Sequence, residues 1–159
     1  MTDHVAKLLA RVTAGAPQNM GTGGSGAIET VNKVMGALGM GRAGRPGTLI
    51  LMANYCEDDS CRRWAEQWLV RYAWIGWLKT ADPSVSVSTG QMARLVSVAL
   101  GQHIDPEAGR RTGVKVMAKL IGMNHQTFRI KFRDHFQRIK VEITTQENMA
   151  IAALVEHYG

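Results

Sequence analysis

The sequence has 159 residues, of which 45% are hydrophobic, and its formal net charge is +6. Its length and apolar content suit one compact domain with a sizeable core. It has only two cysteines, no apolar run long enough to cross a membrane, and no signal-peptide pattern at its N-terminus. These features exclude disulfide-rich secreted and membrane-spanning classes, so we expect a reduced, cytoplasmic protein.

The first 26 residues are expected to form an N-terminal arm. Apolar positions at helical spacing predict a short amphipathic helix over residues 3–14. The segment GAPQNMGTGGSG, residues 15–26, is rich in glycine and contains a proline. Such a segment buries too little apolar surface to offset its ordering entropy, so we interpret it as a flexible linker.

Residues 27–159 are expected to form the helical domain. Apolar spacing predicts a helix over residues 27–38, followed by a glycine-rich break at 39–46. That break has neither the preceding strand of a dinucleotide-binding loop nor the lysine of a phosphate loop. The apolar run at 47–55 is ambiguous between helix and strand, and its Leu, Met and Ala residues favour helix.

A strong helix signal covers residues 56–79. Asp58, Asp59 or Ser60 can cap the first turn, where the helix dipole also favours acidic side chains. Large apolar side chains then recur at near-helical spacing, which is more typical of a core stripe than of a ligand site. They are Trp64, Trp68, Leu69, Tyr72, Ile75 and Trp77.

The elements that follow complete an all-α prediction. The sequence predicts a turn with room for a short extended piece at residues 81–88, a helix at 89–104 and a loop at 105–113. The apolar face of the helix at 89–104 would comprise Met92, Leu95, Val96 and Ala99. Further on, Thr144 and Glu147 have the spacing of a capping box and predict the start of a separate final helix. We therefore expect a compact bundle of seven or eight helices.

No pattern in the sequence indicates catalysis. The pair Cys56 and Cys61 lacks the second ligand pair that a closed zinc site needs. No nucleophile elbow, HExxH or phosphate-loop motif is present. The acids at 57–59 could hold a metal, but serving the helix dipole is the simpler interpretation. We expect a protein that is not an enzyme and that has no cofactor and no metal site.

The positive charge is concentrated in residues 110–140, which we call the basic segment. It holds nine Lys or Arg residues against one acid, Asp134, whereas residues 1–109 hold ten against nine. An ordinary helical hairpin with a solvated charged face would show such a run. So great an excess in an otherwise neutral chain favours a polyanion such as DNA as the partner.

The basic segment also fits a helix-turn-helix. Ala118 allows two helices to cross closely, and Gly122, four residues later, can open the tight turn. The first helix would span about 112–121 and the second about 125–138, with Asn124 as the N-cap of the second. The motif as a whole would occupy about 112–138.

In such a motif the second helix enters the major groove with its N-terminal residues at the base edges. The predicted base contacts are Asn124, His125, Gln126, Thr127, Arg129 and Arg133. The predicted phosphate contacts are Arg110, Arg111, Lys115, Lys119 and Lys131. A charged hairpin packed on the core remains the alternative.

Two stretches resemble a known family. The segment VKVMAKLIGMNHQTFRIKFRDHFQRIKVEITTQENMAIAALVEH is similar to the C-terminal part of the phage lambda-type late antitermination proteins, called Q. VMGALGMGRAG, followed by LMANYCEDDSCRRWAEQWLVRYA, resembles an earlier part of that family. The resemblance covers roughly two-thirds of the chain at low identity. The family's paired-cysteine zinc insertion is replaced here by IDPEAGRRTG, which predicts zinc independence.

The resemblance implies a phage transcription factor that works in the host bacterial cytoplasm. Its partners would be double-stranded DNA near the late promoter and a paused RNA polymerase holoenzyme containing sigma, with nascent RNA as a further potential contact. The factor would let polymerase read through terminators. Two alternatives stay open: a conventional helix-turn-helix repressor or activator, and a phage protein that binds a host factor through its basic face.

Overall fold

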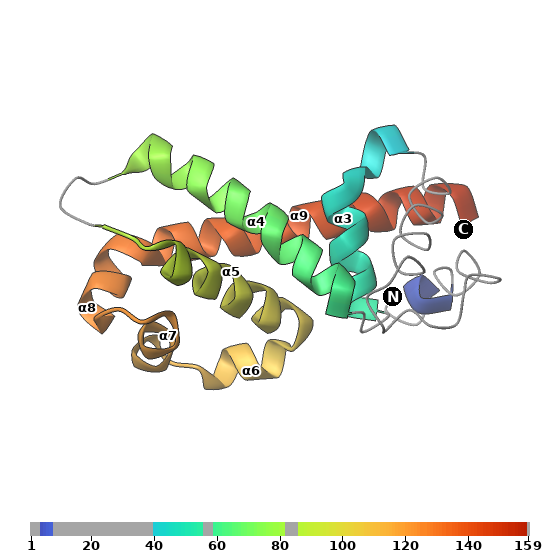
Figure 1. The fold of residues 1–159 in the computed structure, drawn as a ribbon. Coiled ribbons are helices and arrows are strands. Elements are labelled where there is room, and N and C mark those ends of the chain that lie inside the picture. The colour runs from blue at the N-terminus through green and yellow to red at the C-terminus, as the bar shows by residue number, and fades with distance from the viewer. Residues whose placement is uncertain (1–3, 8–39, 56–58, 82–85, 159) are drawn as a thin grey trace. The chain divides into compact units, whose positions relative to one another are not determined.

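The computed structural model describes residues 4–7, 40–55, 59–81 and 86–158, and within these ranges every regular element is helical (Figure 1). The all-α prediction is therefore confirmed for this part of the chain. Of the predicted N-terminal arm, only residues 4–7 are described; they are helical, and Val5 is buried. The predicted linker and the predicted helix at 27–38 lie outside the described residues. No helix in the described ranges has both the length and the apolar character to cross a membrane.

The chain divides into two compact units. The first comprises Met1–Ala65 and Thr144–Gly159, and the second comprises Glu66–Ile143. Two long helices, α4 (Asp59–Thr80) and α9 (Arg133–Tyr158), each contribute residues to both units.

The first unit is organised by helix α3 (Met40–Tyr55). Six consecutive residues, from Thr48 to Ala53, are buried, so this part of α3 is covered on every side. A Cβ atom added at Gly47 would lie 2.3 Å from the backbone oxygen of Gln146, so the glycine permits a close approach to α9. Nearby, Asn54 Nδ2 donates to Glu147 Oε1 at 3.0 Å. This bond provides a partner for a carboxylate that is 4% exposed.

Two sequence predictions in this unit were wrong. The glycine-rich break at 39–46 is helical from Met40 onward, with Pro46 inside the helix. The separate final helix is also absent, because α9 runs without a break through Thr144 and Glu147. In both cases tertiary packing overrides the local signal. Glu147 is turned to Asn54 instead of capping a helix, and the helix that holds Pro46 leads directly into the buried run beginning at Gly47.

The core of the second unit is built around helix α5 (Thr89–Ile104), and both its predicted bounds and its predicted apolar face are confirmed. Ser88 caps the helix through a capping box with Gln91. Helix α6 (Pro106–Arg111) follows where a loop was predicted. The loop prediction was wrong because Asp105, Pro106 and Glu107 together form a helix start: Asp105 caps the helix and Pro106 stands at its first turn.

The predicted apolar stripe of α4 is partly buried. Leu69 and Trp77 are buried, but Ile75 is 56% exposed, so its assignment to the core was wrong. The indole of Trp77 stacks on the Phe132 ring, with 4.8 Å between the ring centres and 6° between the planes. Ile75 stands two residues before Trp77, and in a helix residues two apart point in different directions. The burial of Trp77 therefore leaves Ile75 toward solvent.

Candidate nucleic-acid interface

A tight turn at residues 122–124 joins two helices of the basic segment. Helix α7 (Val114–Ile121) ends at Gly122, whose φ of 84° is left-handed, and the Gly122 and Met123 N–H groups both donate to the Ala118 oxygen. This geometry favours glycine because a Cβ atom would be strained there. Asn124 then caps the next helix by accepting from the Gln126 N–H at 2.8 Å. The predicted glycine turn and the predicted N-cap are both confirmed.

Helix α5 holds this turn in place. Gln91 Nε2 donates to the Gly122 carbonyl oxygen at 2.9 Å, while Gln91 Oε1 accepts from the Ser88 N–H. A Cβ added at Gly122 would also lie 2.8 Å from Arg94 Nη1. Gln91 therefore has two roles: it completes the capping box of α5 and it makes a tertiary hydrogen bond to the turn. The support from Gln91 was not predicted from the sequence, because Gln91 and Gly122 are 31 positions apart.

The helix after the turn has an unusual second turn. It begins as α8 (His125–Thr127), continues as the π-helical turn η2 (Phe128–Phe132), and then becomes α9. Phe128, Phe132 and Phe136 are all buried, at intervals of four residues. In a regular α-helix, side chains four residues apart point in slightly different directions, because one turn takes 3.6 residues. The wider turn takes up this difference and keeps the rings on the packed face.

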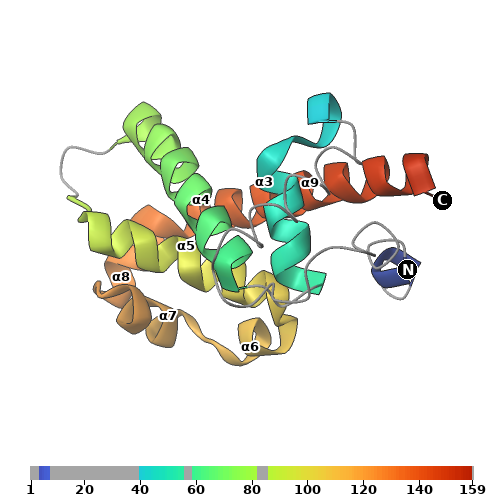
Figure 2. The ribbon, with the colours of Figure 1, turned by 45° about the vertical axis from the view of Figure 1, so that its right-hand side comes forward.

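This packed face meets α7 within the second unit. Helix α7 contacts both α8 and η2, and Figures 1 and 2 both place α7 beside α8. Met117, Ala118 and Ile121 are the buried residues of α7. The first helix of the predicted motif begins at Val114, whereas the sequence predicted a start at about residue 112. The second helical stretch does not end near Arg138 as predicted, because apolar residues continue to recur on its buried face at Ile139 and Ile143.

Most of the predicted base-contacting side chains point to solvent. Five of the six are exposed and one, Thr127, is half-buried. Gln126, Arg129 and Arg133 are spaced three and four residues apart, so they share one side of the helix. Asn124 and His125 precede them at the start of the same helix. The structure thus brings Gln126, Arg129 and Arg133 together on an exposed helix face.

The predicted phosphate-contacting residues are spread over three consecutive elements. Arg110 and Arg111 are exposed on α6, Lys115 and Lys119 are exposed on α7, and Lys131 is half-buried on η2. Arg110 Nη1 lies 2.7 Å from Glu107 Oε1, and both side chains are largely exposed. A surface ion pair of this kind contributes little, so it does not prevent Arg110 from meeting a phosphate. Lys115 and Lys119 are neighbours on one face of α7.

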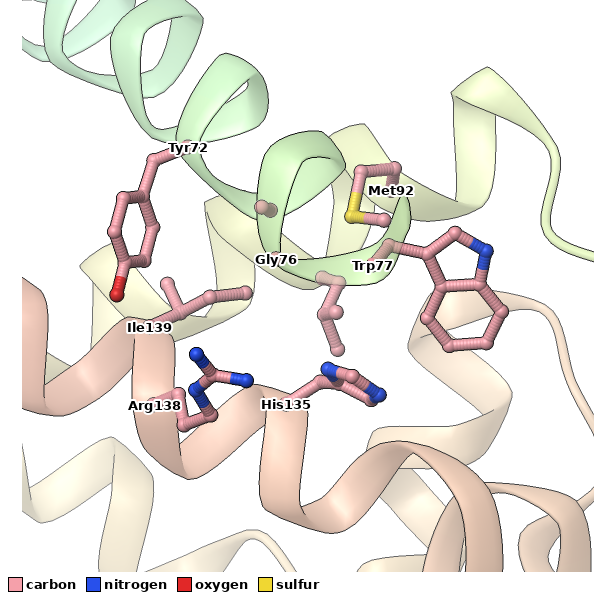
Figure 3. A pocket seen from close by; sticks show the side chains of 9 residues that line it. Tyr72, Gly76, Trp77, Met92, His135, Arg138 and Ile139 are labelled. Atoms are coloured by element: carbon pink, nitrogen blue, oxygen red, sulfur yellow. The ribbon is translucent and has the colours of Figure 1, made fainter. Parts of the chain in front are cut away.

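A mainly apolar pocket lies behind the second helix of the basic segment. It holds about 340 Å³ of empty space, part of it open to solvent. Figure 3 shows the ring of His135 beside the indole of Trp77, with Tyr72 and Arg138 on the other side of the pocket. Burial lowers the pKa of His135, and the charge of Arg138 lowers it further, against an opposing effect of Asp134. His135 is therefore favoured in its neutral form beside the aromatic rings.

Within the described ranges, no three His, Cys, Asp or Glu side chains gather where they could hold a metal ion. Cys61 is fully buried in the first unit, and Cys56 lies outside the described residues. No family model, curated protein or solved structure matches the chain.

Proposed function

We propose that this protein binds double-stranded DNA through a helix-turn-helix formed by α7, the turn at 122–124 and the helix that begins at His125. One observation carries the proposal: the helix capped by Asn124 buries Phe128 and Phe132 and exposes Gln126, Arg129 and Arg133. A helix that enters the major groove needs this division between a packed face and a polar face. The turn that sets its direction is held by Gln91 of α5.

The exposed residue types suit base readout. An Arg side chain pairs bidentately with guanine, and Gln does so with adenine, each pair discriminating against the wrong base by roughly 1–3 kcal/mol. The exposed lysines of α7 and arginines of α6 add affinity that does not depend on sequence, because they meet phosphates. The net excess of positive charge in residues 110–140 supports a polyanionic partner.

We further propose that the biological role is late-gene transcription antitermination in a phage-infected cell. The support is the resemblance of residues 114–157, and of an earlier stretch, to the lambda-type Q proteins. The protein would bind a DNA element near the late promoter, engage the paused sigma-containing polymerase and allow terminator read-through. It catalyses nothing in this scheme. Its affinities for DNA and polymerase reinforce each other, because binding one raises the local concentration of the other.

The antitermination role is tested by transcription in vitro from the late promoter of the phage that encodes the chain, on a template with a downstream terminator. Adding the protein should raise the fraction of transcripts that pass the terminator. Unchanged read-through would refute antitermination. A conventional repressor or activator with the same DNA-binding motif would instead change initiation and commonly bind a two-fold symmetric site as a dimer.

The DNA interface is tested with single substitutions. Arg129→Ala and Gln126→Ala should each relax base preference at one position of the site, by roughly 1–3 kcal/mol. Lys115→Ala should weaken binding to all sequences and reduce the slope of log affinity against log salt by about 1. The measurement is fluorescence anisotropy with labelled duplexes over a range of salt concentrations.

Lys79→Ala is the matched control for Lys115→Ala, since Lys79 is an exposed cation of the second unit that lies in the last turn of α4. Its affinity and salt slope should equal those of the unchanged protein. If Arg129→Ala, Gln126→Ala and Lys115→Ala all bind as the unchanged protein does, the assignment of the second helix to the major groove is wrong.

A further inference from the structure

Ile130 is a large apolar side chain exposed in the middle of the proposed DNA-binding face. It belongs to the π-helical turn η2 and is 68% exposed. It follows Gln126 by four residues and precedes Arg133 by three, so the three side chains lie on the same side of the helix. Isolated exposed apolar residues are common on protein surfaces. The position of Ile130 among the predicted base-contacting residues is what distinguishes it.

Packing does not account for Ile130. The side chains of Phe128 and Phe132 are buried in the core of the second unit, and each is 1% exposed. Ile130 stands two residues from both, and at helical geometry that places it opposite the packed face. The wide turn keeps the two phenylalanines together and so keeps Ile130 directed outward. Whatever buries its side chain must approach from solvent.

We infer that Ile130 contacts the 5-methyl group of a thymine in the major groove, so that the preferred DNA site contains an A·T pair beneath η2. This inference rests on the proposed function. Among the base edges of the major groove, the thymine methyl is the principal apolar group. The side chain is bordered by Arg129 and Arg133, both exposed. The DNA major groove offers acceptor groups on the base edges to the flanking cations and a methyl group to Ile130, whereas an apolar protein surface would have to desolvate those cations.

The test compares thymine with deoxyuridine, which lacks only the methyl group. Full-length protein is first used to select its preferred duplex from a random library. Each thymine of that duplex is then replaced singly by deoxyuridine, and affinities are measured by fluorescence anisotropy at one salt concentration. For the unchanged protein, one replacement should weaken binding by roughly three- to tenfold, as expected for removing one buried methyl contact.

The decisive comparison pairs the DNA change with a protein change. In Ile130→Ala the same thymine replacement should have almost no further effect, and Ile130→Val should retain part of the sensitivity. Val141→Ala is the control, because Val141 is 64% exposed on α9 but lies beyond the predicted base-contacting residues. It should keep the full sensitivity of the unchanged protein. All three substitutions are at exposed positions, and circular dichroism verifies their folding.

The outcomes separate the inference from the function on which it rests. If the unchanged protein selects a duplex but no deoxyuridine replacement weakens binding, the thymine contact is absent while DNA binding stands. Equal sensitivity in Ile130→Ala and the unchanged protein overturns the role of Ile130 in the same way. If no duplex is selected and none is bound, DNA binding itself is refuted, and the inference fails with it.

Discussion

The buried run of α3 in the first unit and the α7 to η2 segment of the second unit use apolar residues in different ways. In α3, the six residues from Thr48 to Ala53 are all buried, so packing explains each of them. In the second segment, buried and exposed residues alternate along each helix, and large apolar residues face solvent at Val116, Leu120 and Ile130. Packing explains only one side of these helices. The exposed apolar residues of the outward side therefore indicate a binding surface.

The glycines of the two regions show the same contrast. Gly47 is needed because another backbone lies too close for a side chain: its added Cβ would be 2.3 Å from the Gln146 oxygen. Gly122 is needed because its own backbone is left-handed. The first constraint comes from packing between helices and the second from the shape of a turn. The loss of unfolding free energy on replacing each glycine measures how strongly each constraint acts.

Gly47→Ala should produce the largest loss. The nearest atom to the added methyl is a backbone oxygen, which cannot rotate away as the end of a side chain can. We expect the free energy of unfolding to fall by roughly 3 kcal/mol, the upper part of the range for overpacked cores. The measurement is urea unfolding followed by circular dichroism.

Gly76→Ala is the matched control for Gly47→Ala, since Gly76 also lies within a helix but an added Cβ there meets nothing within 4 Å. It should raise the free energy of unfolding by about 0.5–1 kcal/mol, because alanine loses less entropy than glycine in a helix. Equal effects of the two substitutions would contradict the close approach of α3 to α9 at Gly47.

Gly122→Ala should have an intermediate effect. An L-residue in the left-handed conformation costs about 1–2 kcal/mol, and the flexible end of Arg94 can move away from the added methyl. The same unfolding measurement checks this value. Gly122→Asn should lose less than Gly122→Ala, because asparagine tolerates this conformation better. If asparagine and alanine lost equal stability, backbone conformation would not be the reason for the glycine.

The smallest expected effect is on the pH dependence of stability, where each of the two units has its own titrating group. Burial lowers the pKa of His135 below its ordinary value of 6.5, so the native state binds fewer protons than the unfolded chain. Stability from this residue is complete above that value and is lost as the pH falls below it toward the native pKa. His135→Gln should therefore flatten the decline of unfolding free energy between about pH 7 and pH 5. An undiminished slope in that variant would assign the decline to other groups.

In the first unit, Tyr55 makes the free energy of unfolding depend on pH at the alkaline end of the scale. Burial, aided by the charge of Glu147, raises its pKa from 10.0. The unfolded chain then loses this proton before the native protein does. The contribution of Tyr55 to stability is thus present below pH 10.0 and is lost as the pH rises through the native pKa.

Local signals predicted those elements whose cause is local. The bounds of α5 followed from its apolar spacing, and the turn at Gly122 and Asn124 followed from the conformations that these residue types adopt. The same kind of signal is present at Asp105 and Pro106, which begin α6 where a loop was predicted. The capping pattern at Thr144 was a false signal, because Glu147 finds its partner on another helix.

By itself the sequence determined the all-α character of the described residues, the concentration of positive charge in residues 110–140, and the glycine turn, since these depend on composition and neighbouring residues. Only the tertiary structure decided that α9 is continuous, that Gln91 supports the turn, and that Ile130 faces outward. Burial and long-range hydrogen bonds arise between residues far apart in the chain. For Ile75 and Ile130 the local sequence did not specify which apolar side chains the packing of other helices would leave exposed.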